Sequence, residues 1–234
     1  INEVAMIELR SIGIPSPRVE SEQKVGGKAV YAGDVVLPGM LWVKVLRSPV
    51  AHARIKKIDT PRARAQPALK TILTGDDFGG ARIGKKIIDM PILADGVVRY
   101  VGEKVVAVAA QSEIEAEAAL DLIDVDYEEL PAVLDPLQAL EPSAALLHPD
   151  LARYKGQLHT IESPSNLFVH LTWKKGEVEE GFRQSDITVE NTYSVPAVHQ
   201  AYIEPHCCLA KVNPDASAEI WASTKSPFNL REQV

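Results

Sequence analysis

The chain has 234 residues with a formal net charge of −7, 46% hydrophobic residues and 24% charged residues. This composition is ordinary for a globular protein, and no apolar run approaches the roughly 18–20 residues of a membrane span. A protein that contacts nucleic-acid phosphates needs clustered Lys and Arg, so the negative charge argues against that class. The N-terminal residues carry acidic groups and no signal-peptide pattern, so we expect a cytoplasmic location.

The first part of the chain predicts an arm followed by strands and one helix. Residues 1–20 contain "GIPSPR" and no clear period, which indicates an N-terminal arm. Alternating or continuous apolar patterns then predict strands over residues 41–48, 53–59, 69–73, 96–100, 103–110 and 123–130. The stretch 103–110 is nearly all apolar, so we expect it to be central in its sheet.

One helix is predicted between the last two of these strands. Ser112 can cap its N-terminus, and Glu115 three residues later completes a capping box. Ile114, Ala118 and Ile123 recur with Ala119 and Leu122 on roughly one face.

The second part predicts a linker and then a further set of elements. Residues 134–165 are rich in Pro, Ala, Ser and Leu, which indicates a linking segment with one short helix in "PLQAL". Strands are predicted at "LFVHLTWKKG", "DITVENTYSV", "YIEPHCCLAKV" and "AEIWAST", and helices at "EVEEGFRQS" and at the final "NLREQV". The fold class is therefore α+β, in two structural pieces.

Four side chains that can bind metals gather in the short stretch "HQAYIEPHC", namely His199, Glu204, His206 and Cys207. A metal site needs three or four ligands in compatible geometry. Because no other cluster supplies further ligands nearby, a metal site is the weaker interpretation. The adjacent thiols of Cys207 and Cys208 are interpreted as free cysteines, at least one of them buried.

Three other patterns have a structural explanation that we prefer. The carboxylates of Asp76 and Asp77 and of "VDYEEL" are expected to be solvated surface charges, and "VGGKAV" is expected to be a turn rather than a phosphate loop. Ser223 and Lys225 could form a nucleophilic dyad, but their spacing is not that of Ser-x-x-Lys enzymes. Lys225 is therefore interpreted as a donor at the C-terminal end of a strand.

Five blocks of this sequence occur together and in a consistent order. They are the Gly-x-Ala-x-Tyr-x-x-Asp run of residues 27–34, "RSPVAHA" at 47–53, "ILTGDDF", the stretch 98–133, and "HQAYIEPHCCLA" followed by "WASTKSPF". Together they resemble the molybdenum-binding large subunit of the xanthine dehydrogenase and aldehyde oxidase family. The resemblance covers nearly the whole chain from about residue 12, which is more specific than any one motif.

The resemblance implies a domain organisation. Residues 1–20 would be an arm, residues 21–134 a hammerhead-type α/β domain, and residues 135–165 a linker. Residues 166–234 would be the start of an incomplete α+β molybdopterin-binding domain. Its strands would belong to a larger sheet, so we expect exposed apolar surface after Asn166.

The resemblance also implies a chemistry. The family oxidises aldehydes, N-heterocycles and related substrates with water, using molybdenum on molybdopterin or its cytosine dinucleotide form. FAD and [2Fe–2S] clusters would lie on partner subunits, and the rest of the molybdenum-binding polypeptide would be a further partner. The chain would be a portion of a longer chain or a short subunit, active only when assembled. The alternative is a non-catalytic structural or assembly module.

One residue is carried over as a cofactor-binding residue. The family has Gln at the position of Lys225, and that Gln donates a hydrogen bond to the molybdenum centre. Lys225 can also donate, but it cannot accept and it adds a positive charge. That charge would either suit an anionic cofactor or mark a diverged site. The catalytic residues of the family are expected outside this chain.

Overall fold

The computed structural model describes residues 12–156 and 164–234, so most of the predicted arm lies outside the described residues. The chain divides into two compact units. Unit 1 combines residues 12–37 with His199–Lys225, and unit 2 combines Pro38–Val198 with Ser226–Val234. Each unit therefore draws on two separate parts of the sequence.

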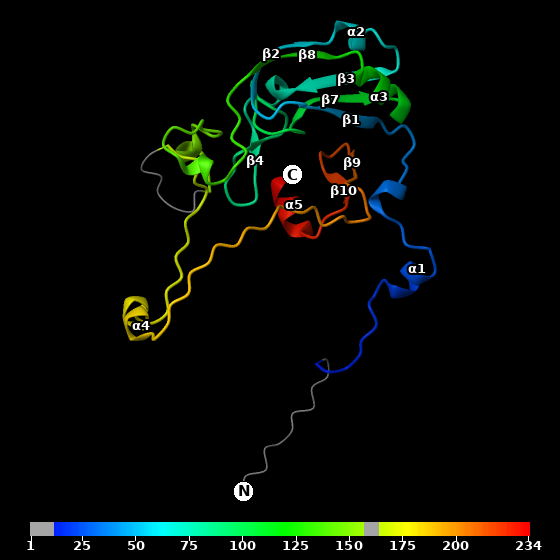
Figure 1. Ribbon diagram of the computed structural model, residues 1–234. Helices are drawn as coiled ribbons and strands as arrows, with labels where there is room; N and C mark the ends of the chain where they lie inside the picture. Colours follow the sequence, from blue (N-terminus) through cyan, green and yellow to red (C-terminus); the bar gives the residue numbers. More distant parts are fainter. Residues whose placement is uncertain (1–11, 157–163) are drawn as a thin grey trace. The chain divides into compact units, whose positions relative to one another are not determined.

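Unit 2 is built on two three-stranded antiparallel sheets (Figure 1). The first has the order β1–β7–β3, with β1 Trp42–Arg47, β7 Lys104–Ala110 and β3 Leu69–Thr74. The second has the order β6–β2–β8, with β6 Val97–Val98, β2 Ala53–Asp59 and β8 Asp124–Glu129. The predicted central position of 103–110 is confirmed, because β7 pairs with a strand on each side.

The core lies around β7. Val105, Val106 and Val108 are almost fully buried, together with Val98 of β6 and Ala53 of β2. Valine is favoured in such a strand because its branched side chain packs well on a pleated surface. Burial of several such side chains supplies the main stabilisation of the unit.

Helix α3 (Glu113–Leu120) packs on β1 and β7 and begins as the sequence predicts. Ser112 Oγ accepts the Glu115 N–H at 3.3 Å and donates to Glu115 Oε2 at 2.8 Å. The predicted face is confirmed at Ala119 and Ile123, which are buried, and is wrong at Ile114, which is 79% exposed, and at Ala118.

The buried face of α3 is formed by alanines. Ala116 and Ala119 are fully buried, while Ile123 is buried just beyond the helix end. Alanine has little side-chain volume, so these two positions let the helix approach the sheet closely. The apolar pattern of a helix this short does not distinguish such a face from its neighbour.

The "RSPVAHA" segment is a loop whose polar groups are used internally. Ser48 Oγ donates to the Val50 carbonyl at 2.8 Å, and Arg47 Nη1 donates to the Gly102 carbonyl at 2.9 Å. His52 Nδ1 donates to the Pro131 carbonyl at 2.7 Å, which ties the end of β8 to this loop. These residues hold strand ends together.

Unit 1 contains one hairpin among its described residues, formed by β9 (Cys208–Val212) and β10 (Ala218–Ala222) with Cys208 opposite Ala222. Its turn is closed by Asn213 N–H, which donates to the Ser217 carbonyl at 2.8 Å. Short helices precede it in the chain. The remaining elements of both units are α1 Ser21–Val25, η1 Ala32–Asp34, α2 Pro61–Arg64, η2 Gly75–Phe78, β4 Arg82–Ile83, β5 Met90–Pro91, η3 Gln138–Leu140, η4 Leu151–Arg153, α4 Val178–Gln184 and α5 Pro227–Gln233.

Two predicted strands are wrong. The stretches 167–176 and 186–195 contain no strand, and β9 covers only the second half of the predicted 202–212. A strand needs a neighbour for its N–H and C=O groups, and no described strand pairs with these stretches.

The predicted apolar exposure after Asn166 is confirmed, for example at Trp173, which is 91% exposed. The predicted helices near 177–185 and at the end of the chain are confirmed as α4 and α5. No helix within the described ranges combines the length and apolar character needed to cross a membrane.

Candidate functional site

Lys225 follows the hairpin of unit 1 at a bend three residues after β10 ends. Its side chain is exposed, and no carboxylate among the described residues forms an ion pair with it. A lysine in this state presents three N–H donors and a positive charge to whatever approaches the strand end. Such a group suits an anionic ligand.

Ser223 has a different role from Lys225. Its Oγ donates to the Pro205 carbonyl at 3.2 Å and accepts the Cys207 N–H at 3.4 Å. The hydroxyl therefore fixes the chain before β9 to the end of β10. Because the hydroxyl proton is directed at a backbone carbonyl and not at the Lys225 amine, the geometry does not support a nucleophilic dyad.

Two of the candidate metal ligands of unit 1, His199 and His206, contact the ring of Tyr202 instead. The Tyr202 ring lies 4.9 Å from the rings of both His199 and His206, and it is stacked on His206 with an interplanar angle of 21°. His199 Nδ1 accepts the Ala201 N–H at 3.0 Å. Within residues 12–156 and 164–234, no three His, Cys, Asp or Glu side chains group as metal ligands would.

The two cysteines and the acidic pair have ordinary surroundings. Cys207 and Cys208 are free thiols as predicted, but Cys207 is only half-buried and Cys208 is exposed, so the expected buried thiol is wrong. Asp77 caps the short helix η2, because its Oδ2 accepts the Thr74 N–H at 2.6 Å. Asp77 therefore stabilises a turn.

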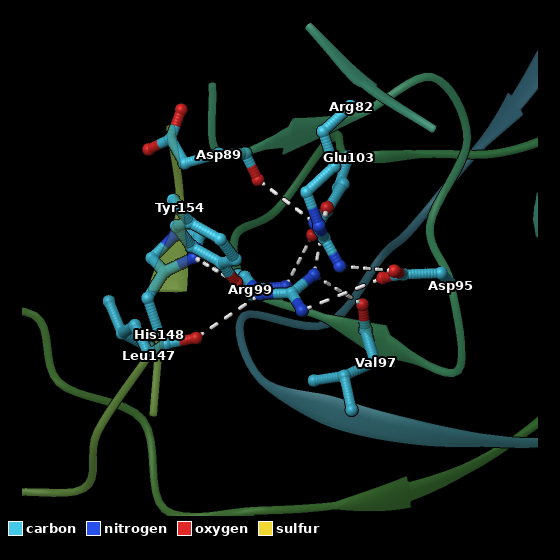
Figure 2. Close-up of polar contacts among 9 residues, drawn as sticks. All are labelled: Arg82, Asp89, Asp95, Val97, Arg99, Glu103, Leu147, His148 and Tyr154. Carbon is cyan, nitrogen blue, oxygen red and sulfur yellow. Dashed lines mark hydrogen bonds and ion pairs between the residues drawn. The ribbon is translucent and has the colours of Figure 1, made fainter. Parts of the chain in front are cut away.

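A network of polar contacts in unit 2 joins charged side chains from several segments (Figure 2). Arg82 donates to the Asp95 carboxylate and, through Nη1, to the Asp89 carbonyl at 2.9 Å. Arg99 Nη2 lies 3.6 Å from Asp95 Oδ1, and its Nη1 lies 3.6 Å from Glu103 Oε1. We call Arg82, Asp95, Arg99 and Glu103 the ionic cluster.

Within this cluster, burial affects the protonation of Glu103. Glu103 is 4% exposed, and burial raises the pKa of its carboxyl, while the Arg99 N–H and guanidinium oppose that change. The Arg99 backbone N–H donates to Glu103 Oε2. These bonds satisfy the carboxylate from inside the protein, so the cluster is a structural clamp.

His148 and Tyr154 border the ionic cluster. Burial lowers the pKa of His148, and the nearby Arg99 lowers it further. His148 Nδ1 lies 3.4 Å from Tyr154 Oη, and the Arg82 guanidinium lies over the Tyr154 ring at 5.1 Å from its centroid. No sequence motif predicted the ionic cluster or the contacts that His148 and Tyr154 make beside it. Charged residues flanking an apolar strand, such as Glu103 before β7, were the only local signal.

Two family models match successive parts of the chain. Residues 26–131 match the model of the aldehyde oxidase and xanthine dehydrogenase a/b hammerhead domain. Residues 158–234 match the model of a molybdopterin cofactor-binding domain.

Curated relatives carry related names. The chain is 36% identical to a probable xanthine dehydrogenase subunit of Bacillus subtilis, over 93% of this chain and 27% of that protein. It is 34% identical to the nicotinate dehydrogenase large molybdopterin subunit of Eubacterium barkeri, over 95% of this chain and 49% of that protein. The chain therefore spans about a quarter to a half of the length of these relatives.

Solved structures agree with the fold. The chain is similar to the Cu,Mo-CO dehydrogenase in its carbon monoxide reduced state, with a TM-score of 0.80 and 31% identity over 95% of this chain and 29% of that one. It is also similar to quinoline 2-oxidoreductase from Pseudomonas putida 86, with a TM-score of 0.73 and 32% identity over 89% of this chain and 26% of that one.

Proposed function

The chain belongs to the xanthine dehydrogenase and aldehyde oxidase family, as a portion of its molybdenum-binding large subunit, and we propose that it helps to hold a molybdopterin cofactor in a hydroxylase complex. One observation carries the proposal. A hammerhead match at 26–131 is followed by a cofactor-binding match at 158–234 in one chain. The domain division at 21–134 and 166–234 is part of this proposal.

The donor chemistry at the end of β10 fits an anionic cofactor. Lys225 is exposed and has no ion-pair partner among the described residues, so its charge is available to a phosphate or a pterin oxygen. When bound, a molybdenum–pterin group supplies oxidation of the substrate with oxygen from water. Lys225 would bind and orient the group as a hydrogen-bond donor, and Ser223 would hold the strand end in place through Pro205 and Cys207.

We also propose a substrate class, a form of the cofactor and the partner subunits. The substrate would be an aldehyde, an N-heterocycle or a related compound, and the cofactor would be molybdopterin or its cytosine dinucleotide form. The remaining molybdenum-binding polypeptide and subunits carrying FAD and [2Fe–2S] would complete the enzyme in the cytoplasm. Relatives named for xanthine, nicotinate and carbon monoxide support the class but differ in substrate.

Metal and pterin analysis of the assembled complex tests the proposal. The complex is isolated through a tag on this chain, and its molybdenum and its oxidised pterin fluorescence are measured per copy. We expect about one molybdenum and one pterin per chain. A correctly assembled complex with neither would overturn the hydroxylase function and favour the assembly module.

A further inference from the structure

Residues 145–156, which we call the latch, are held within unit 2 by hydrogen bonds to both the N–H and the carbonyl of Leu147. The Leu147 N–H donates to Asn166 Oδ1 at 3.0 Å, and its carbonyl accepts Arg99 Nε at 3.2 Å. Asn166 Nδ2 also donates to the Ala145 carbonyl at 2.9 Å. One residue, Leu147, therefore joins the ionic cluster to the position at which the predicted second domain begins.

The far end of the latch is held by a close backbone contact. The Ile88 N–H donates to the Lys155 carbonyl at 2.9 Å. Gly156 has φ +83°, and a Cβ added there would lie 1.8 Å from the Lys86 carbonyl oxygen. Only glycine fits this conformation and this approach, so the contact depends on it.

His148 occupies the middle of the latch, where charged groups face it from several elements. Arg99 and Arg82 oppose its protonation, while Asp89 and Asp95 favour it. The Tyr154 ring meets the imidazole edge-on, with centroids 5.7 Å apart at 82°. The imidazole is therefore partly desolvated beside two permanent cations (Figure 2).

We propose that the latch is closed on the ionic cluster while His148 is neutral and opens when His148 is protonated. Protonation places a third cation beside Arg82 and Arg99 in a partly buried site, where charges interact more strongly than in water. Opening the latch lets the imidazolium reach solvent. It also releases the Arg99 bond to the Leu147 carbonyl, and thereby the connection to Asn166.

The sign of the pH effect follows from the lowered pKa of His148, for which burial is the main cause and Arg99 the next. The open latch binds a proton more readily than the closed latch. The stability of the closed latch is therefore complete above the ordinary histidine pKa of about 6.5 and declines as pH falls below it. Glu103 acts in the opposite direction, because its raised pKa favours a proton in the closed state at more acidic pH.

Hydrogen–deuterium exchange of the full chain tests this proposal. The amides of Leu147 and Ile88 report latch opening, and the amides of β7 serve as the internal reference. Between about pH 7.5 and pH 5 we expect the protection of the two latch amides to fall by up to about tenfold per pH unit, relative to β7. Constant relative protection over this range would overturn the proposal.

Three variants identify the responsible group. His148→Gln stays neutral and should abolish the pH response, while His170→Gln, at an exposed histidine, should retain it. Gly156→Ala should open the far end of the latch at every pH. A pH response that survives in His148→Gln would show that another group is responsible and contradict the proposal.

An NMR titration of the His148 imidazole gives a second readout that requires no variant. Its midpoint should lie below the usual histidine range and within the pH interval in which latch protection falls. A midpoint at or above that range would contradict the latch. The outcome does not depend on molybdenum content, so failure of the latch and failure of the proposed function are distinguishable.

Discussion

Lys225 and Ser223 lie two positions apart at the end of β10, but their contacts give them separate tasks. Ser223 is committed to the backbone at Pro205 and Cys207, whereas Lys225 is exposed and without an ion pair among the described residues. A residue that stabilises the fold is satisfied inside it, and a residue that binds a ligand keeps donors available. This contrast supports Lys225, and not Ser223, as the ligand-facing residue.

Substitutions at Lys225 test the need for a donor and for a charge. Lys225→Gln keeps an N–H donor without the charge, and we expect it to retain at least about half of the bound molybdenum. Lys225→Glu places a negative charge before an anionic cofactor, and we expect at least about a tenfold loss of molybdenum per chain.

Molybdenum content of the purified complex, measured by elemental analysis, checks both expectations. Lys70→Gln, at an exposed lysine of β3, is the matched control and should behave as the unmodified protein. Full molybdenum loading of Lys225→Glu would show that this side chain does not face the cofactor.

A substitution at Glu103 tests how much the ionic cluster contributes to the free energy of unfolding. Removing its buried carboxylate by Glu103→Ala leaves the largely covered Arg99 guanidinium with one fewer partner. Breaking a buried pair from one side costs about 3–5 kcal/mol of unfolding free energy. Urea denaturation should show a loss of that order, and Glu128→Ala, in an exposed pair with Lys56, should cost less than about 1 kcal/mol. Equal losses of unfolding free energy in the two variants would mean that the ionic cluster stabilises the protein no more than a surface ion pair does.

At the scale of elements, helix α3 shows which structural features its own sequence could predict and which it could not. Ser112 caps the helix as predicted, but the predicted capping box is incomplete, because the Glu115 carboxylate accepts from the Ser112 hydroxyl and not from its N–H. The buried face could not be predicted from Ile114, because the helix is short and the residues that meet the sheet are alanines.

The cap itself can be tested. Ser112→Ala removes the acceptor for the Glu115 N–H and should lower the unfolding free energy by about 1 kcal/mol. Chemical denaturation measures the change. Ser143→Ala, at an exposed serine outside any helix, is the control and should change stability by less than about 0.5 kcal/mol. A Ser112→Ala protein as stable as the control would refute the role of the cap.

Strands were predictable where the chain supplies its own partner. The predicted 53–59 coincides with β2, and 103–110 differs from β7 by one residue. The stretches 167–176 and 186–195 have equally strong patterns but no partner in the described chain. The pattern of one segment cannot report which neighbour is present. For the same reason it could not report that Arg82 pairs with Asp95 across a loop, so the ionic cluster was missed.

At the scale of the whole molecule, the exposed apolar side chains are consistent with a chain that matches only a portion of its relatives. Trp173, Tyr193 and Ile203 are more than four-fifths exposed, all of them within the match to the cofactor-binding domain. Exposed apolar stretches of this kind mark surfaces that other protein covers. The chain also spans a quarter to a half of its relatives, so the proposed complex would provide that cover.

The distance from Lys225 Nζ to the cofactor in a structure of the assembled complex tests the central claim most directly. Electron cryo-microscopy at a resolution that shows side chains would measure it. We predict that Nζ lies within about 3.2 Å of an oxygen or phosphate of the molybdenum–pterin group. A Lys225 side chain that points into solvent, with the cofactor bound elsewhere, would contradict the account.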